Sequence, residues 1–130
     1  MINKSDQLQK YFNAIEEQNW KEIDSILDKD FTLFNQDGSQ LNKKKYVKYL
    51  KKNGKQFKKF GFKHETSNFQ ESGGECRCDV KFRYTNLDME QGSFSLESDG
   101  VEKEVRQDPN FVHIAVFKED RISKLTITME

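Results

Sequence analysis

His113 is the residue of this chain best suited to acid–base chemistry, because an imidazole gains and loses a proton near neutral pH. It stands inside the apolar run 111–117, where strand alternation places it on one side with Phe111, Ala115 and Phe117. Either it acts as a general acid or base, or it is a core or interface histidine held by one hydrogen bond. Alternation alone leaves open which face of the sheet carries it.

Asp30, Asp37 and Tyr84 are the other candidate catalytic residues. A buried carboxylate with a raised pKa serves as a base in enolisation or dehydration, and a phenol steadies the developing oxyanion. Each residue also has a structural interpretation. Asp30 is suited to a cap or turn before the next strand, Asp37 to a turn with Gly38, and Tyr84 to a core position with one hydrogen-bond partner.

Four soft metal ligands occur in the chain, which is the number that a tetrahedral zinc site needs: His64, Cys76, Cys78 and His113. The two cysteines alternate with charged residues along one expected strand instead of flanking a turn, so they are interpreted as core thiols. No glycine-rich phosphate loop or serine-nucleophile elbow is present. We therefore expect no metal site and no cofactor.

The run 43–63 contains ten lysines and no acid, whereas the flanking parts of the chain are acidic and the total net charge is zero. Such a run could bind an acidic protein, an anionic membrane surface or nucleic acid, or it could be a solvated helix face. The absence of arginine from the run weighs against nucleic acid. The sequence predicts a protein partner that contacts Lys43, Lys44, Lys45, Lys48, Lys51 and Lys52.

Two amphipathic helices are expected before residue 30. Apolar residues recur at helical spacing, first at Leu8, Tyr11, Phe12 and Ile15, and then at Trp20, Ile23, Ile26 and Leu27. Ser5 and Asp6 are suited to cap the first helix. A short strand with Phe31 and Leu33 leads into the Asp37–Gly38 turn. A third helix follows, with Asn42 as its N-cap and Asn53–Gly54 as a stop or a weak point.

From Phe60 onward the apolar period changes from 3.6 to 2, which indicates strands. Further strands are expected at 75–84, between Gly92 and Asp99, from Val101, at 111–117 and at 122–129. Helices followed by a long antiparallel sheet predict an α+β fold of one domain, residues 1–130, in which the N-terminal helices cover one face of a curved sheet.

Composition also limits the setting of the protein. No apolar stretch approaches the roughly 18 residues that cross a bilayer, and the first residues do not resemble a signal peptide. The spacing of the two cysteines is poor for a mutual disulfide, which fits a reducing compartment. We expect an intracellular protein, by default cytoplasmic, although the interior of an organelle is also compatible.

Three stretches of the chain resemble the nuclear-transport-factor-2-like superfamily, which includes the SnoaL-like proteins. They are YFNAIEEQNWKEIDSILDKDFTLFNQDG, LNKKKYVKYLKK and FVHIAVFKEDRISKLTI, in which Asp30, the Asp37–Gly38 turn and His113 occupy familiar places. The chain has Glu119-Asp120-Arg121 where many relatives have Asp-Gly, so the geometry of that final turn stays open. The resemblance implies a cone whose strongly curved, mostly antiparallel sheet wraps a central pocket and dimerises through its outer face.

Because this fold hosts both enzymes and non-catalytic subunits, the resemblance does not determine activity. No complete catalytic set is evident, so the leading hypothesis is a non-catalytic accessory subunit or protein-interaction module of a larger assembly. The alternative is a small isomerase, dehydratase or cyclase that works without a cofactor on an apolar molecule in the cone pocket. In that case His113, Asp37, Asp30 and Tyr84 would be its catalytic residues.

Overall fold

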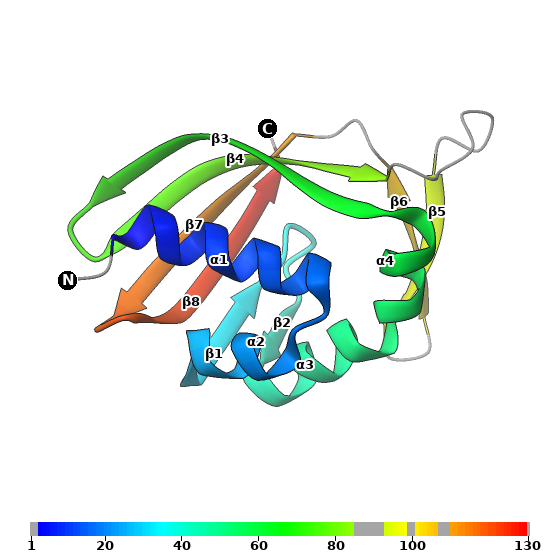
Figure 1. Cartoon of the computed structure of the whole chain (residues 1–130), viewed down its shortest axis with the longest axis horizontal. Helices are drawn as coiled ribbons and strands as arrows, with labels where there is room; N and C mark the ends of the chain where they lie inside the picture. Colours follow the sequence, from blue (N-terminus) through cyan, green and yellow to red (C-terminus); the bar gives the residue numbers. More distant parts are fainter. Residues whose placement is uncertain (1–2, 85–92, 99–100, 107–109, 130) are drawn as a thin grey trace.

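The computed structural model of the chain begins with helices and continues with strands (Figure 1). It describes residues 3–84, 93–98, 101–106 and 110–129. Helix α1 spans Lys4–Glu17 and lies along the concave side of the curved sheet. Its inward face is the apolar stripe expected from the sequence, because Leu8, Tyr11, Phe12 and Ile15 are all buried.

The N-cap of α1 differs from the expected one. Asn3, not Ser5 or Asp6, precedes the helix, and its side chain accepts hydrogen bonds from the backbone N–H groups of both of those residues. The helix ends at Gln18, whose left-handed backbone (φ 56°) turns the chain toward α2, Trp20–Ile26. Asn19 caps α2 by accepting from the backbone N–H of Glu22.

Strand β1, Leu27–Phe34, begins earlier than expected, so Leu27 opens a strand instead of closing a helix. Asp30 therefore lies inside the strand and is not a turn residue before Phe31. The expected Asp37–Gly38 turn is present, with Gly38 at φ 84°, a conformation that glycine adopts without strain. A short strand that the sequence did not predict follows as β2, Gln40–Asn42.

Helix α3, Lys43–Lys52, has the expected cap, because the Asn42 side chain accepts from the backbone N–H of Lys45. It also stops at Asn53, as predicted. The chain continues as a separate helix, α4, Gly54–Phe60, which ends at Gly61 in the left-handed conformation. Phe60 thus belongs to a helix, and the first long strand starts at Phe62 rather than at Phe60.

Six strands form one sheet in the order β2-β1-β8-β7-β4-β3, in which only the β1–β8 pair is parallel. Besides β1 and β2, this sheet contains β3, Phe62–Ser72, β4, Glu75–Tyr84, β7, Asn110–Lys118, and β8, Arg121–Met129. The helices and the mostly antiparallel sheet make the fold α+β, as predicted. Strands β5, Ser93–Ser98, and β6, Val101–Arg106, pair with each other as a separate two-stranded sheet, and β5 contacts α3 (Figure 1).

The β7–β8 hairpin closes tightly although it lacks the Asp-Gly of many relatives. Lys118 pairs with Arg121, so only Glu119 and Asp120 form the loop. Glu119 supplies the required backbone geometry with φ 57°, a conformation that costs a residue with a Cβ about 1 kcal/mol or more. The final turn is thus a tight one, and Glu119 adopts a strained left-handed conformation in it.

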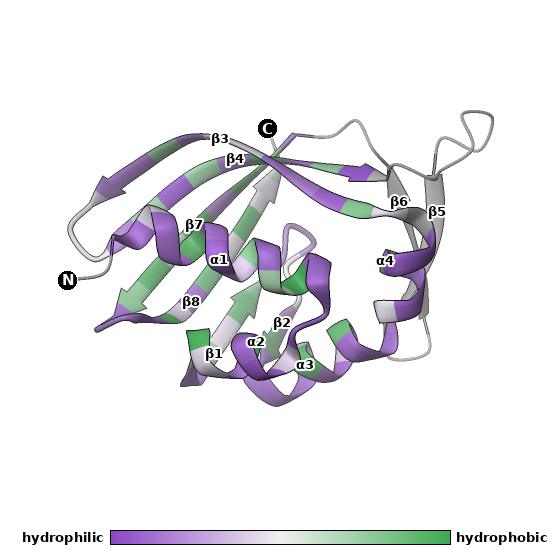
Figure 2. Cartoon of the chain, viewed as in Figure 1, coloured by the Kyte–Doolittle hydropathy of each residue, from purple (hydrophilic) through white to green (hydrophobic). Residues whose placement is uncertain are grey.

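The core lies between α1, α2 and α3 on one side and the concave sheet face on the other. Apolar residues of these helices and of the strands are buried there, and Figure 2 shows the hydropathy of each residue along the ribbon. Cys76, Cys78 and Val80 alternate with polar residues along β4 and are fully buried, which confirms the predicted period of two. Both cysteines are free thiols.

Candidate functional site

His113 faces the interior of the fold. Its position on β7 lies between Cys78 of β4 and Ile127 of β8, and only 3% of the residue is exposed. Its ring meets that of Phe12 on α1 edge-on, with a centroid distance of 5.3 Å, and that of Phe82 at 6.1 Å. The side of the strand that carries His113 is therefore the side covered by α1.

The environment of His113 keeps its imidazole neutral. Burial, and to a smaller extent the nearby His64, lowers the pKa of His113 to about 3. Within the described part of the chain, Nδ1 of this ring is buried and has no hydrogen-bond partner. A buried polar atom without a partner costs about 1–3 kcal/mol, so a bound molecule that satisfied it would recover that free energy.

A second buried imidazole, His64 on β3, is hydrogen-bonded to Glu16 near the end of α1. Nδ1 of His64 lies 3.0 Å from Oε2 of Glu16, and the backbone N–H of His64 donates to the same oxygen at 3.1 Å. The exposed fractions of the two side chains are 3% and 11%. The ammonium of Lys63, 3.5 Å from the other carboxylate oxygen, adds a positive charge at the solvent side.

The pair has a defined protonation at neutral pH. Burial by itself raises the pKa of Glu16, but the hydrogen bonds from His64 outweigh it and the pKa lies below its ordinary value. Burial lowers the pKa of His64, and Glu16 offsets this only in part. A carboxylate only accepts hydrogen bonds, so we infer that the neutral His64 carries its proton on Nδ1 and keeps a basic lone pair on Nε2.

Phenylalanine rings surround both imidazoles. His64 stacks on Phe12 at 4.7 Å and also contacts Phe62 and Phe82, with centroids at 4.6 Å and 5.6 Å. Phe82 in turn packs on Phe111 at 5.0 Å. These rings lower the local dielectric constant and leave both histidines in a largely apolar setting. Electrostatic interactions are stronger in such a setting than in water.

Two tyrosine hydroxyls meet elsewhere in the same core. The hydroxyl groups of Tyr11 on α1 and Tyr46 on α3 are hydrogen-bonded to each other, and both side chains are buried. Burial raises the pKa of each well above the ordinary value, and it raises the pKa of the neighbouring Tyr49 to about 12. All three phenols are therefore neutral at physiological pH and are able to donate hydrogen bonds.

The other predicted catalytic residues are placed differently. Asp30 is exposed on β1, and Asp37 is exposed in its turn, where Oδ1 accepts from the backbone N–H and hydroxyl of Ser39. Neither joins His113 in the interior. Tyr84 is the last residue of β4, opposite Phe62, and its side chain lies outside the described part of the structure.

Sequence reasoning missed Glu16 and considered His64 only as a metal ligand. One signal was available for His64, because it is in phase with Phe62 on a strand whose apolar side must face the core. No such signal exists for Glu16, which is 48 residues away in the chain.

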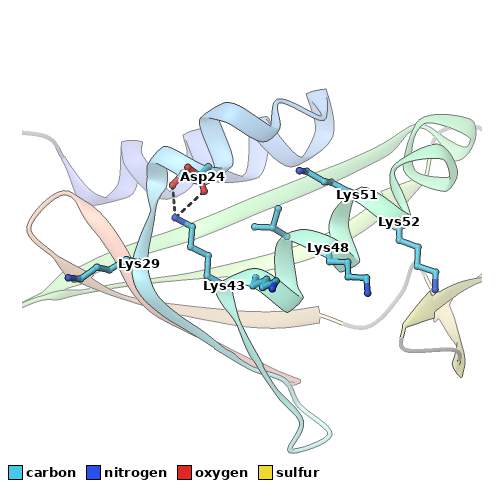
Figure 3. A pocket seen from close by; sticks show the side chains of 8 residues that line it. Asp24, Lys29, Lys43, Lys48, Lys51 and Lys52 are labelled. Carbon is cyan, nitrogen blue, oxygen red and sulfur yellow. Dashed lines mark hydrogen bonds and ion pairs between the residues drawn. The ribbon is translucent and has the colours of Figure 1, made fainter.

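The predicted lysine surface lies on the opposite side of α3 from Tyr46. A depression of about 1000 Å³ is lined by Lys43, Lys44, Lys48, Lys51 and Lys52 of α3, together with Val47, Lys29 of β1 and Asp24 of α2 (Figure 3). Lys45, the remaining lysine of the predicted set, does not line it. Lys43 differs from the rest, because its ammonium is tied to Asp24 and to backbone carbonyls at the end of α2.

No three histidine, cysteine or acidic side chains come together as a metal site in residues 3–84, 93–98, 101–106 and 110–129. Among the helices in these ranges, none is long and apolar enough to cross a membrane.

No protein-family model and no curated protein sequence matches this chain. Solved structures do match over nearly its whole length. An NTF2-like protein of unknown function from Burkholderia pseudomallei has a TM-score of 0.65 and 12% identity, with 100% of this chain and 92% of that chain covered.

Two further structures cover a comparable share. A protein of unknown function with a cystatin-like fold from Xanthomonas campestris has a TM-score of 0.62 and 16% identity, over 98% of this chain and 91% of that one. An LEH-like epoxide hydrolase of Mycobacterium tuberculosis has a TM-score of 0.59 and 10% identity, over 95% and 80%. At such identities the likeness concerns the backbone. The chain has the cone-shaped, cystatin-like fold of the nuclear-transport-factor-2-like superfamily, as its sequence predicted.

Proposed function

We propose that the protein is a small enzyme that moves protons on an apolar molecule in the interior of the cone, without a cofactor. The observation that carries this proposal is the Glu16–His64 pair, which lies beside a second buried imidazole with an unpartnered Nδ1. Isomerisation, dehydration and cyclisation all consist of removing a proton at one atom and returning one at another. The phenylalanine shell favours an apolar substrate.

The roles follow from the protonation states. His64 accepts the substrate proton at Nε2, and the Glu16 carboxylate stabilises the imidazolium that forms, since it lies 3.0 Å from Nδ1. His113 remains neutral because its pKa is about 3, so it acts through hydrogen bonds and not as a cation. A neutral ring can donate a hydrogen bond to a substrate oxygen and so stabilise the negative charge that develops there in the transition state. Because the ring carries no charge, it does not favour an anionic ground state in the same way.

The fold is compatible with this activity, since an epoxide hydrolase has the same fold. The fold does not select a reaction, so the support comes from the histidine site itself. Asp30 and Asp37 have no part in this version of the enzyme hypothesis, because both side chains are exposed.

Hydrogen–deuterium exchange on small ketones provides a direct test. The protein is incubated in D₂O with a panel of cyclic and aromatic ketones, and NMR follows exchange of the C–H groups beside the carbonyl. We expect acceleration by the wild type and a loss of about 100-fold or more in Glu16→Gln. Glu17→Gln is the matched control, because Glu17 is the next residue of α1 and is exposed. Equal rates in the two variants would refute the role of the pair.

A non-catalytic accessory subunit is the second candidate, and the outer sheet face is the observation that favours it. Ile114 and Val116 alternate with His113 on β7 and are only half-buried, as is Phe34 on β1. An apolar sheet face of this kind suits a homodimer or another protein. If this face pairs with a second copy, Ile114→Lys will convert a dimer to a monomer in sedimentation velocity. A wild type that sediments as a monomer at all concentrations would remove the dimer proposal.

A further inference from the structure

The lysine-lined depression on α3 is separate from the histidine site. Tyr46 and Leu50 on one side of α3 are buried in the core, whereas Lys44, Lys48 and Lys51 on its other side are exposed. The described residues that line the depression include six lysines and one aspartate. The depression therefore has a strong positive charge, and none of the residues that line it belongs to the histidine site.

Lys43 is held by contacts within the fold. The Lys43 ammonium donates to the backbone oxygens of Asp24 and Leu27 at 2.9 and 3.0 Å and pairs with the Asp24 carboxylate at 3.2 Å (Figure 3). This pairing neutralises the aspartate of the depression. The positive charge considered for a partner comes from Lys29, Lys44, Lys48 and Lys51.

The other lysines form a line and do not converge on a point. Lys44, Lys48 and Lys51 recur at intervals of four and three residues, so they follow one side of α3 over a length of about 10 Å. Lys29 adds an exposed ammonium from β1. Figure 3 shows the side chains of Lys29, Lys48, Lys51 and Lys52 pointing in different directions. Such an arrangement fits several negative charges spread along a chain better than one small anion.

We propose that this depression binds an acidic peptide segment of another protein, with glutamates or aspartates spaced along an extended or helical backbone. Ammonium groups on flexible stems match carboxylates at varied positions, whereas bidentate phosphate recognition favours arginine, which the surface lacks. The hollow shape does not suit a planar membrane. Charge complementarity over this length gives specificity and fast association.

Binding of a fluorescein-labelled ten-residue glutamate peptide, measured by anisotropy at low salt, tests the proposal. The binding variant is Lys44→Gln/Lys48→Gln/Lys51→Gln. The matched control is Lys45→Gln/Lys55→Gln/Lys58→Gln, which removes the same charge from exposed lysines of the same run that do not line the depression. We expect the first triple variant to bind about tenfold more weakly and the control to bind like the wild type. Binding should weaken as salt increases.

Several outcomes would overturn the proposal. They are no measurable binding of the peptide, equal losses in both triple variants, and tighter binding of a ten-nucleotide single-stranded DNA or of anionic phospholipid vesicles. Self-association that the first triple variant abolishes would mean that a second copy occupies the depression instead. None of these measurements depends on catalysis, so the proposal is tested separately from the proposed enzyme activity.

Discussion

At the scale of single residues, the two imidazoles of the proposed acid–base site differ in their surroundings. His64 has a carboxylate partner, which fixes its tautomer and stabilises a positive charge on the ring. His113 has no such partner, and its burial opposes protonation. Two histidines that share the Phe12 contact thus differ in basicity because only one of them has a neighbouring anion.

The burial of His113 predicts an acid sensitivity of the fold. Its pKa falls from 6.5 in the unfolded chain to about 3 in the folded protein, so its contribution to stability is complete above pH 6.5 and is lost as the pH falls toward 3. From pH 7 to pH 5 this contribution decreases by about 2 kcal/mol. Urea unfolding of His113→Leu at both pH values should give a smaller decrease than the wild type by that amount. Parallel pH profiles would contradict this assignment.

The Tyr11–Tyr46 hydrogen bond predicts non-additive substitutions. Tyr11→Phe leaves the Tyr46 hydroxyl buried without its partner and should cost about 1–3 kcal/mol of unfolding free energy. Tyr11→Phe/Tyr46→Phe removes both hydroxyls, so its cost should be well below the sum of the two single variants. A double-mutant cycle from urea unfolding measures the coupling. Simple additivity would mean that the hydroxyls are satisfied independently.

At the scale of elements, Lys43 connects two helices. It opens α3, and its ammonium satisfies carbonyl groups at the end of α2, a helix of seven residues. Lys43→Met should destabilise the protein by about 1–2 kcal/mol, because these carbonyls lose a charged donor. Lys44→Met changes an exposed neighbour with the same net charge effect and should stay within about 0.5 kcal/mol of the wild type. Equal effects of the two substitutions on thermal unfolding would disprove the capping role.

The β7–β8 turn predicts a stabilising substitution. Glu119 is exposed and holds φ 57°, so Glu119→Gly should relieve more backbone strain than it adds in unfolded-state entropy, for a net gain of about 0.5–1 kcal/mol. Glu119→Ala keeps the Cβ and should give no such gain. Chemical denaturation of both variants compares them, and a glycine variant no more stable than the alanine variant would count against the strain.

At the scale of the whole molecule, one buried cluster joins the helices to the six-stranded sheet, with residues from α1, α2, α3, α4 and every long strand. We propose from this continuity that these elements unfold as one cooperative unit. The fluorescence of Trp20 on α2 and the circular dichroism of the sheet should therefore follow one urea transition with the same midpoint. Two separate midpoints would divide the chain into more than one cooperative unit.

The sequence by itself determined the elements and their faces. Helical spacing identified the buried stripe of α1, and alternation identified the buried side of β4, because each pattern follows from the geometry of a single segment. The clustering of lysines on α3 is likewise local, since six of its ten residues are lysines and most of them must lie on the outer side of the helix.

Only the tertiary structure decided which groups meet. The Glu16–His64 pair joins the end of α1 to the start of β3 across 48 residues, and no local pattern encodes such a contact. The same is true of Lys43, whose role depends on the end of α2 lying beside the start of α3. His113 faces inward because α1 covers that side of the sheet, a choice made by packing between distant segments, whereas alternation fixes only which residues share a side.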